Sequence, residues 1–281
     1  MARLVHPFPS LLDGAVVVLI ALVAGGAPRT ALLLGMSMTL IQFGIGALND
    51  IMDARRDAVA KPDKPIPAGL VSLPDARMIA AAAASIGLVM SAAGGLALVC
   101  LAALCLAIGI WYDVRAKGTT LSWLPLAVGI PLLPVFGWLG ATGELPGIFL
   151  VLVPAAANAG TALAIANSIV DVELDEASGV ESIATALGVR RAAWLALALQ
   201  GVVAVLAVST ALVVGTPAGW LAAVVAASLL PLIGGAGGVL AATRDPAWRE
   251  LAWDIQAVGA GLLAVAWLGA LSASAGSPLG G

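Results

Sequence analysis

Acidic side chains recur at helical spacing in the stretch from Asn49 to Gly69, the most densely charged part of the chain. Asp50, Asp53 and Asp57 are three and four residues apart, and Asn49 lies four residues before Asp53. If a helix continues through these positions, the three carboxylates share one of its faces. We therefore expect a dense negative charge on one side of a helix end.

The same spacing occurs a second time further along the chain. Asn167, Asp171 and Asp175 are again four and four residues apart, which would stack three oxygen-bearing side chains on one helical face. A single charged residue between apolar segments is usually a solvated interface residue, but two copies of N-x3-D-x3-D are hard to obtain from loop composition. The repeat predicts two acidic helix ends that face each other across a cavity.

Like-charged carboxylates at this spacing repel and need a compensating cation. Mg²⁺ prefers oxygen ligands and is typically held by one or two carboxylates together with waters and substrate phosphate oxygens. The pattern therefore predicts a phosphorylated substrate bound through Mg²⁺. Lys64, Arg115 and Lys117 lie in loops on the same side of the predicted spans, where they would neutralise a departing diphosphate.

The composition places the chain in a lipid bilayer. Hydrophobic residues make up 61% and charged residues only 10%, whereas a soluble domain carries roughly 25% charge. A net charge of −3 without a run of Lys and Arg excludes a nucleic-acid partner held by bulk attraction. Cys100 and Cys105 lie in an apolar run and indicate neither a disulfide framework nor a metal site. No feature of the sequence indicates a protein partner.

Apolar stretches long enough to cross about 30 Å of hydrocarbon indicate nine membrane-spanning helices. We expect an all-α polytopic membrane bundle, with residues 1–281 forming a single domain. The stretches cover residues 11–27, 30–49, 77–94, 96–112, 122–141, 147–170, 191–214, 218–241 and 251–273.

The distribution of basic residues predicts the orientation of the chain. With nine spans, every Lys and Arg except Arg29 falls on the side of the N-terminus. By the positive-inside rule the N-terminus is cytoplasmic and the C-terminus is outside the cell membrane. Both acidic helix ends then lie at the cytoplasmic face, where we expect the active site.

These two motifs resemble those of the UbiA superfamily of intramembrane prenyltransferases. The first family motif, approximately N-D-x2-D-x3-D followed by R-P-x3-G, is matched from Asn49 to Asp57 and then by Lys64, Pro65 and Gly69. The second, D-x3-D-x3-G, is matched by Asp171, Asp175 and Gly179. The resemblance covers almost the whole chain, and the two motifs together are a specific signal.

The resemblance implies a metal-dependent transfer of an isoprenyl chain from a polyprenyl diphosphate to a lipophilic, aromatic or glycerol-phosphate-type acceptor. It implies Mg²⁺ ions held by Asp53, Asp57, Asp171 and Asp175, with Asp50 as a less secure ligand and with Asn49 and Asn167 assisting at the diphosphate. Lys64 and Lys117 would bind the diphosphate and help it leave. Tyr112 would stabilise an allylic cation through its ring face, and a tyrosine of the interfacial belt is the alternative interpretation.

The chain departs from the family pattern at two positions. Lys64 replaces the usual Arg, which keeps the charge but loses the bidentate fork of a guanidinium. Tyr112 and Lys117 are five residues apart, whereas the hydroxybenzoate branch has four. The loop KPDKPIPAG is closer to the branch of chlorophyll, homogentisate and archaeal ether-lipid synthases.

Two other functions are compatible with parts of the pattern. A UbiA-type terpene cyclase would use the same site but quench the cation internally, without an acceptor. A divalent-cation transporter would use the acids as an ion path, but the acids cluster on one side with none in the middle of a span to continue a route. The D-G-x2-A-R element of the CDP-alcohol phosphotransferases does not occur in the sequence.

Overall fold

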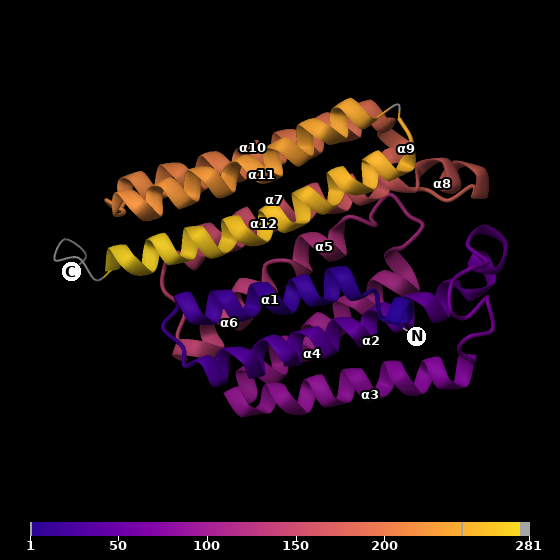
Figure 1. Cartoon of the computed structure of the whole chain (residues 1–281), viewed down its shortest axis with the longest axis horizontal. Coiled ribbons are helices and arrows are strands. Elements are labelled where there is room, and N and C mark those ends of the chain that lie inside the picture. Colours follow the sequence, from indigo (N-terminus) through magenta and orange to yellow (C-terminus); the bar gives the residue numbers. More distant parts are fainter. Residues whose placement is uncertain (1, 243, 276–281) are drawn as a thin grey trace. The chain divides into compact units, whose positions relative to one another are not determined.

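The computed structural model describes residues 2–242 and 244–275, and this part of the chain is helical without a strand. Figure 1 shows the helices in chain order. Their bounds are η1 (Ala2–Val5), α1 (Pro7–Val23), α2 (Pro28–Ala60), α3 (Leu73–Ser91), η2 (Ala92–Gly94), α4 (Leu96–Trp111), η3 (Tyr112–Ala116), α5 (Leu124–Gly129), α6 (Leu132–Thr142), α7 (Phe149–Val170), α8 (Val172–Ser178), α9 (Ile183–Leu187), α10 (Val189–Val213), α11 (Ala218–Ala241) and α12 (Pro246–Ala275).

The expected all-helical membrane architecture is confirmed, with a difference in the number of long spans. Eight helical segments of the described chain are long and apolar enough to cross a membrane. The first expected span, residues 11–27, corresponds to α1, which has only 17 residues. At a rise of about 1.5 Å per residue, such a helix is shorter than the roughly 30 Å of hydrocarbon in a membrane. The fifth expected span is interrupted between α5 and α6, next to Pro131.

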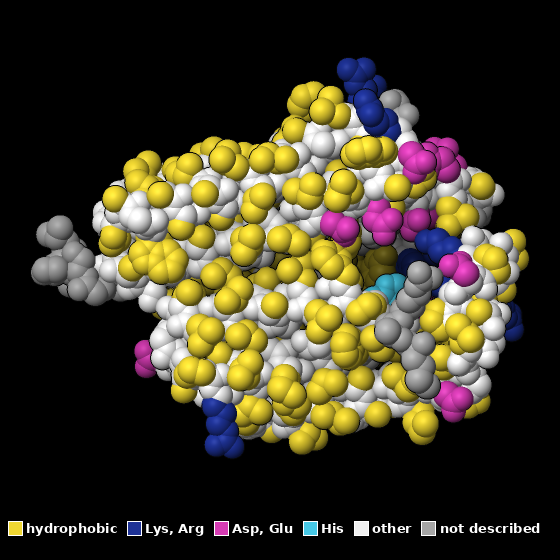
Figure 2. Space-filling model, viewed as in Figure 1, with side chains coloured by type: hydrophobic (Ala, Val, Ile, Leu, Met, Phe, Trp, Pro, Cys, Tyr) yellow, Lys and Arg dark blue, Asp and Glu magenta, His cyan; other side chains and the backbone are white. Residues whose placement is uncertain are grey.

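Large hydrophobic side chains lie on the outer surface of the helices, as lipid contact requires. Leu32 of α2, Val89 of α3, Val205 of α10 and Leu240 of α11 are each more than half exposed. Figure 2 shows hydrophobic side chains over most of the visible surface. In water such a surface would be an aggregation liability, so the burial pattern agrees with an integral membrane protein.

The described helices fall into two compact units. The first unit runs to Arg115 and includes Phe136–Glu144, and the second comprises Ala116–Val135 and the chain from Leu145 onward. In the first unit α2 packs against α1, α3 and α4. In the second unit α7 packs against α5, α10 and α12, and α11 packs against α10 and α12. The single domain expected for residues 1–281 stays a prediction.

The long helix α2 carries the first acidic motif. It continues past the predicted end at residue 49 to Ala60, so Asp50, Asp53 and Asp57 lie within its last three turns. The loop after it is fixed by backbone hydrogen bonds, from Leu70 N–H to the Pro65 carbonyl at 2.9 Å and from Gly69 N–H to the Ile66 carbonyl at 3.0 Å. Gly69 has φ +70°, which explains the glycine of this motif because other residues rarely adopt that conformation.

The second acidic motif lies at a helix break, which the sequence did not predict. α7 ends at Val170, α8 begins at Val172, and Asp171 between them has φ −100° and ψ 15°. Asp175 N–H still donates to the Asp171 carbonyl at 2.9 Å. The expected unbroken helix through this motif is therefore wrong, although one turn still connects Asp171 to Asp175. Gly179 ends α8 in the left-handed conformation, with φ 65°.

A core of buried apolar side chains supports this break within the second unit. Ile169 of α7 and Val172 of α8 pack with Ala184 of α9 and with Ala192 and Ala196 of α10. Val172 is adjacent to Asp171, so the core fixes the backbone next to the acid. The short helices α8 and α9 are thereby anchored to the long ones.

The close packing of α5 on α7 depends on Gly160. A Cβ at this position would lie 2.3 Å from the carbonyl oxygen of Leu126. We expect Gly160→Ala to lower the free energy of unfolding in detergent by about 1–3 kcal/mol through overpacking. Gly201→Ala on α10 is the matched control because nothing lies within 4 Å of its Cβ position. Thermal unfolding of both variants checks this expectation, and an unchanged midpoint for Gly160→Ala would show that the two helices are less closely packed.

Candidate functional site

Lys64 joins two buried carboxylates at the end of α2. Its Nζ lies 2.8 Å from Oδ1 of Asp50 and 2.8 Å from Oδ2 of Asp57. The side chains of both acids are 3% exposed, and that of Lys64 is 22% exposed. Carboxylates so far from water are costly unless they are paired, and here both pair with one ammonium group. Lys64, which stands where the family usually has Arg, therefore holds two acids of the first motif together.

The same contacts keep Lys64 charged. Burial alone lowers the pKa of its ammonium, but the hydrogen bonds and charges of Asp50 and Asp57 outweigh burial, so the pKa is raised above its usual value. Lys64 is consequently a cation at neutral pH. It offers a fixed positive charge at this helix end.

His6 is a second partner of Asp50 that sequence reasoning missed. Its Nε2 lies 3.0 Å from Oδ1 of Asp50, the oxygen that also accepts from Lys64. His6 precedes α1 in a left-handed conformation with φ 47°, which directs the chain from η1 into that helix. The other oxygen of Asp50, Oδ2, is buried without a hydrogen-bond partner. Nothing in the local sequence around His6 indicates this contact.

Asn49 is held by Asp113, which follows α4. Its Nδ2 donates to Oδ1 of Asp113 at 2.7 Å, and Asp113 is buried. Asp113 belongs to η3, a π-helical turn that begins at Tyr112 and contains Arg115. Single π turns are frequent at functional sites. This contact brings the loop expected to bind diphosphate against the first acidic motif.

The remaining acid of the first motif is Asp53. Oδ2 of Asp53 lies 3.4 Å from Nη2 of Arg56, and the side chain of Asp53 is 13% exposed. It is thus more accessible than Asp50 and Asp57. Of the three carboxylates it is the best placed to meet a ligand that arrives from outside the helix.

The second motif is more open and belongs to the second unit. Asn167 is exposed, and Asp171 and Asp175 are partly buried. Lys117 also belongs to this unit and is partly buried, whereas Arg115 is exposed in the first unit. Each unit therefore contains the acids of one motif and at least one of the predicted basic residues.

Arg249 of α12 is a further charged residue that the sequence did not single out. Its Nη2 donates to Oε1 of Glu173 at 2.5 Å and its Nη1 to the carbonyl of Ile169 at 3.0 Å. The hydrogen bond from Arg249 lowers the pKa of Glu173. This pairing makes Glu173 a poorer base.

The donor set fits Mg²⁺ in chemistry. The first motif offers carboxylate and amide oxygens, the ligands that this hard cation prefers, including the unpartnered Oδ2 of Asp50. Within the described residues, however, no three His, Cys, Asp or Glu side chains are grouped closely enough to hold a metal ion.

Comparisons with known proteins identify the family. A model of the UbiA prenyltransferase family matches residues 14–255. A digeranylgeranylglyceryl phosphate synthase from Methanoculleus marisnigri is 32% identical over 207 residues, which are 70% of this chain and 71% of that protein.

Two solved structures share the fold. The apo structure of a UbiA homolog from Aeropyrum pernix K1 has a TM-score of 0.75 at 21% identity, covering 95% of this chain and 98% of that one. A UbiA homolog from Archaeoglobus fulgidus bound to GPP and Mg²⁺ has a TM-score of 0.70 at 17% identity, covering 93% and 98%. Since the family model spans most of the chain and the helical fold agrees with it, this integral membrane protein is a prenyltransferase and belongs to the UbiA prenyltransferase family.

Proposed function

We propose that this prenyltransferase moves an isoprenyl chain from a polyprenyl diphosphate to the hydroxyl group of a glycerol-phosphate-type lipid, with Mg²⁺. The activity in the name of the Methanoculleus marisnigri relative supports the acceptor class. The GPP and Mg²⁺ bound to the Archaeoglobus fulgidus homolog support the donor class and the metal. In this chain the proposal rests on Lys64, whose ammonium group is held between Asp50 and Asp57 at a helix end.

We propose that carboxylates of both motifs hold the Mg²⁺–diphosphate complex. Bound Mg²⁺ would neutralise the charge that the diphosphate gains as it leaves. Asp53 and the second motif are more accessible than Asp50 and Asp57, so they are the first to meet an incoming complex. The proposed ligands are Asp53, Asp57, Asp171 and Asp175, with Asp50 contributing through its unpartnered oxygen.

Basic and polar residues next to these acids would bind the diphosphate itself. Lys64, Arg115 and Lys117 supply positive charge, and Asn49 and Asn167 supply amide groups. As the bond between C1 and the diphosphate oxygen breaks, its electron pair leaves with the diphosphate and the allylic carbon becomes positive. The ring of Tyr112 would face that charge.

The acceptor oxygen then forms the new bond to C1, and its hydroxyl proton is released. Water would compete with the acceptor for the same carbon. Apolar helices would supply a dry wall for the isoprenoid chain, which would favour transfer over hydrolysis.

We propose that the site faces the cytoplasm, as the basic residues predict. In a background without Cys100 and Cys105, a cysteine replacing Asp63 should react with a membrane-impermeant maleimide only after intact cells are opened. A cysteine replacing Glu144, which follows α6, should react from outside. The reverse labelling pattern would show the opposite orientation.

Loss of one carboxylate from either motif should stop the reaction. We expect Asp53→Ala and Asp175→Ala each to lower the Mg²⁺-dependent release of diphosphate by about 100-fold or more, because charge stabilisation at the leaving group is lost. Glu144→Gln is the control, since this exposed acid belongs to neither motif. Release is measured with purified protein and geranylgeranyl diphosphate. Turnover at the wild-type rate in either alanine variant would refute the metal site.

Lys64 should affect both stability and catalysis. Lys64→Met leaves the carboxylates of Asp50 and Asp57 without their shared cation, so we expect a lower unfolding temperature and a rate about 100-fold lower. Lys64→Arg keeps the charge and should retain most of the activity. Adding Asp50→Asn to Lys64→Met removes one of the two unpaired buried charges and should restore part of the stability but not turnover. If the double variant recovered turnover as well as stability, the role of Lys64 would be structural only.

A further inference from the structure

Arg249 is a buried cation outside the residues assigned to the reaction. It lies in the first turn of α12, and its side chain is only 2% exposed. Its guanidinium contacts the carbonyl of Ile169 and the carboxylate of Glu173. These partners lie two residues before and two residues after Asp171, so Arg249 contacts both sides of the helix break that carries the second acidic motif.

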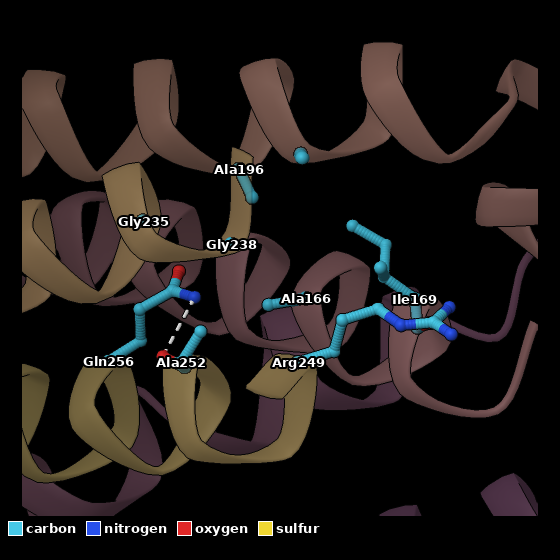
Figure 3. A pocket seen from close by; sticks show the side chains of 9 residues that line it. Ala166, Ile169, Ala196, Gly235, Gly238, Arg249, Ala252 and Gln256 are labelled. Carbon is cyan, nitrogen blue, oxygen red and sulfur yellow. Dashed lines mark hydrogen bonds between the residues drawn. The ribbon is translucent and has the colours of Figure 1, made fainter. Parts of the chain in front are cut away.

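The surroundings of Arg249 leave its guanidinium few other interactions. It lines a cavity whose walls include Ala166 of α7, Ala193 of α10, Gly238 of α11 and Ala252 of α12. Figure 3 shows the side chain extending from α12 to Ile169. Apart from Gln256, the other side chains that line this cavity are apolar and cannot hydrogen-bond a guanidinium, and the Nε of Arg249 is buried without a partner. The two contacts at the α7–α8 break are therefore the ones that orient Arg249.

The chemistry of the break explains why a cation is useful there. The carbonyl of Ile169 is one of the last four carbonyls of α7. These carbonyls would accept hydrogen bonds from the next turn if the helix continued without a break. A positive charge at a helix C-terminus is favourable because it opposes the helix dipole. Arg249 provides that charge from a different helix, and thus fixes the direction in which α8 leaves α7.

We propose that Arg249 is a positioning residue that orients Asp171 and Asp175 for the Mg²⁺–diphosphate complex. This inference rests on the proposed function. Residues that hold metal ligands in place affect metal affinity by about 10- to 100-fold when they are replaced. Arg249 acts through the backbone of α7 and through Glu173, and does not touch the substrate.

The test measures binding rather than turnover. Calorimetric titration of inorganic diphosphate into purified protein in excess Mg²⁺ gives its affinity, and the same titration in EDTA gives the metal-independent background. We expect Arg249→Gln to weaken the Mg²⁺-dependent affinity about 10-fold and Arg249→Lys to recover part of it, because one hydrogen bond can still form. Arg191→Gln is the matched control, since Arg191 is an exposed arginine at the start of α10 of the same unit.

Glu173→Gln separates positioning from folding. The side chain of Glu173 is 63% exposed, so the variant should fold even if Arg249→Gln does not, and it should weaken Mg²⁺-dependent binding in the same direction. Unchanged affinity in Glu173→Gln and in any folded Arg249 variant would overturn the inference while leaving the proposed function intact. Wild-type protein that binds diphosphate equally with Mg²⁺ and with EDTA would overturn both.

Discussion

The ammonium group of Lys64 between Asp50 and Asp57 is the interaction on which the first motif depends. Two carboxylates on one helical face, both removed from water, would repel each other and oppose the continuation of α2 to Ala60. The loop from Lys61 to Ser72 returns Lys64 to that face and so compensates the charge. One ammonium group against two carboxylates leaves a net negative charge, so we propose that a diphosphate binds only together with additional positive charge, which Mg²⁺ would supply.

Each acidic motif has its own anchor within its own unit. In the first unit His6 and Asp113 contact Asp50 and Asn49, so α1 and the π-helical turn η3 are tied to α2. In the second unit Arg249 ties α12 to the end of α7. In both cases the acid-bearing helix end is held by a charged side chain from another helix. Such anchors fix side chains more accurately than a solvated loop would.

The spacing of the acids correctly predicted a helix through the first motif, because α2 continues to Ala60. The apolar runs predicted the helical membrane architecture. The second motif was predicted less well, since the break at Asp171 depends on packing of Val172 and Ile169 and not on a local signal. The partners His6, Asp113 and Arg249 were missed because they lie 44, 64 and 76 residues from Asp50, Asn49 and Glu173. Contacts over such separations arise from tertiary structure. Pro131 is a local signal for the interruption of the fifth expected span. It was overlooked because the residues around it are uniformly apolar.

Family membership removes the cation transporter from the alternatives, and the remaining question is what reacts with the allylic carbon. The most direct measurement incubates the purified protein with radiolabelled geranylgeranyl diphosphate, Mg²⁺ and, in separate reactions, a glycerol-phosphate ether lipid, an aromatic acid or no acceptor, followed by identification of the labelled product. The proposed function predicts a labelled ether lipid that forms only with the glycerol-phosphate acceptor and only with Mg²⁺. A labelled hydrocarbon in the reaction without acceptor, or a prenylated aromatic acid in preference to the ether lipid, would contradict it.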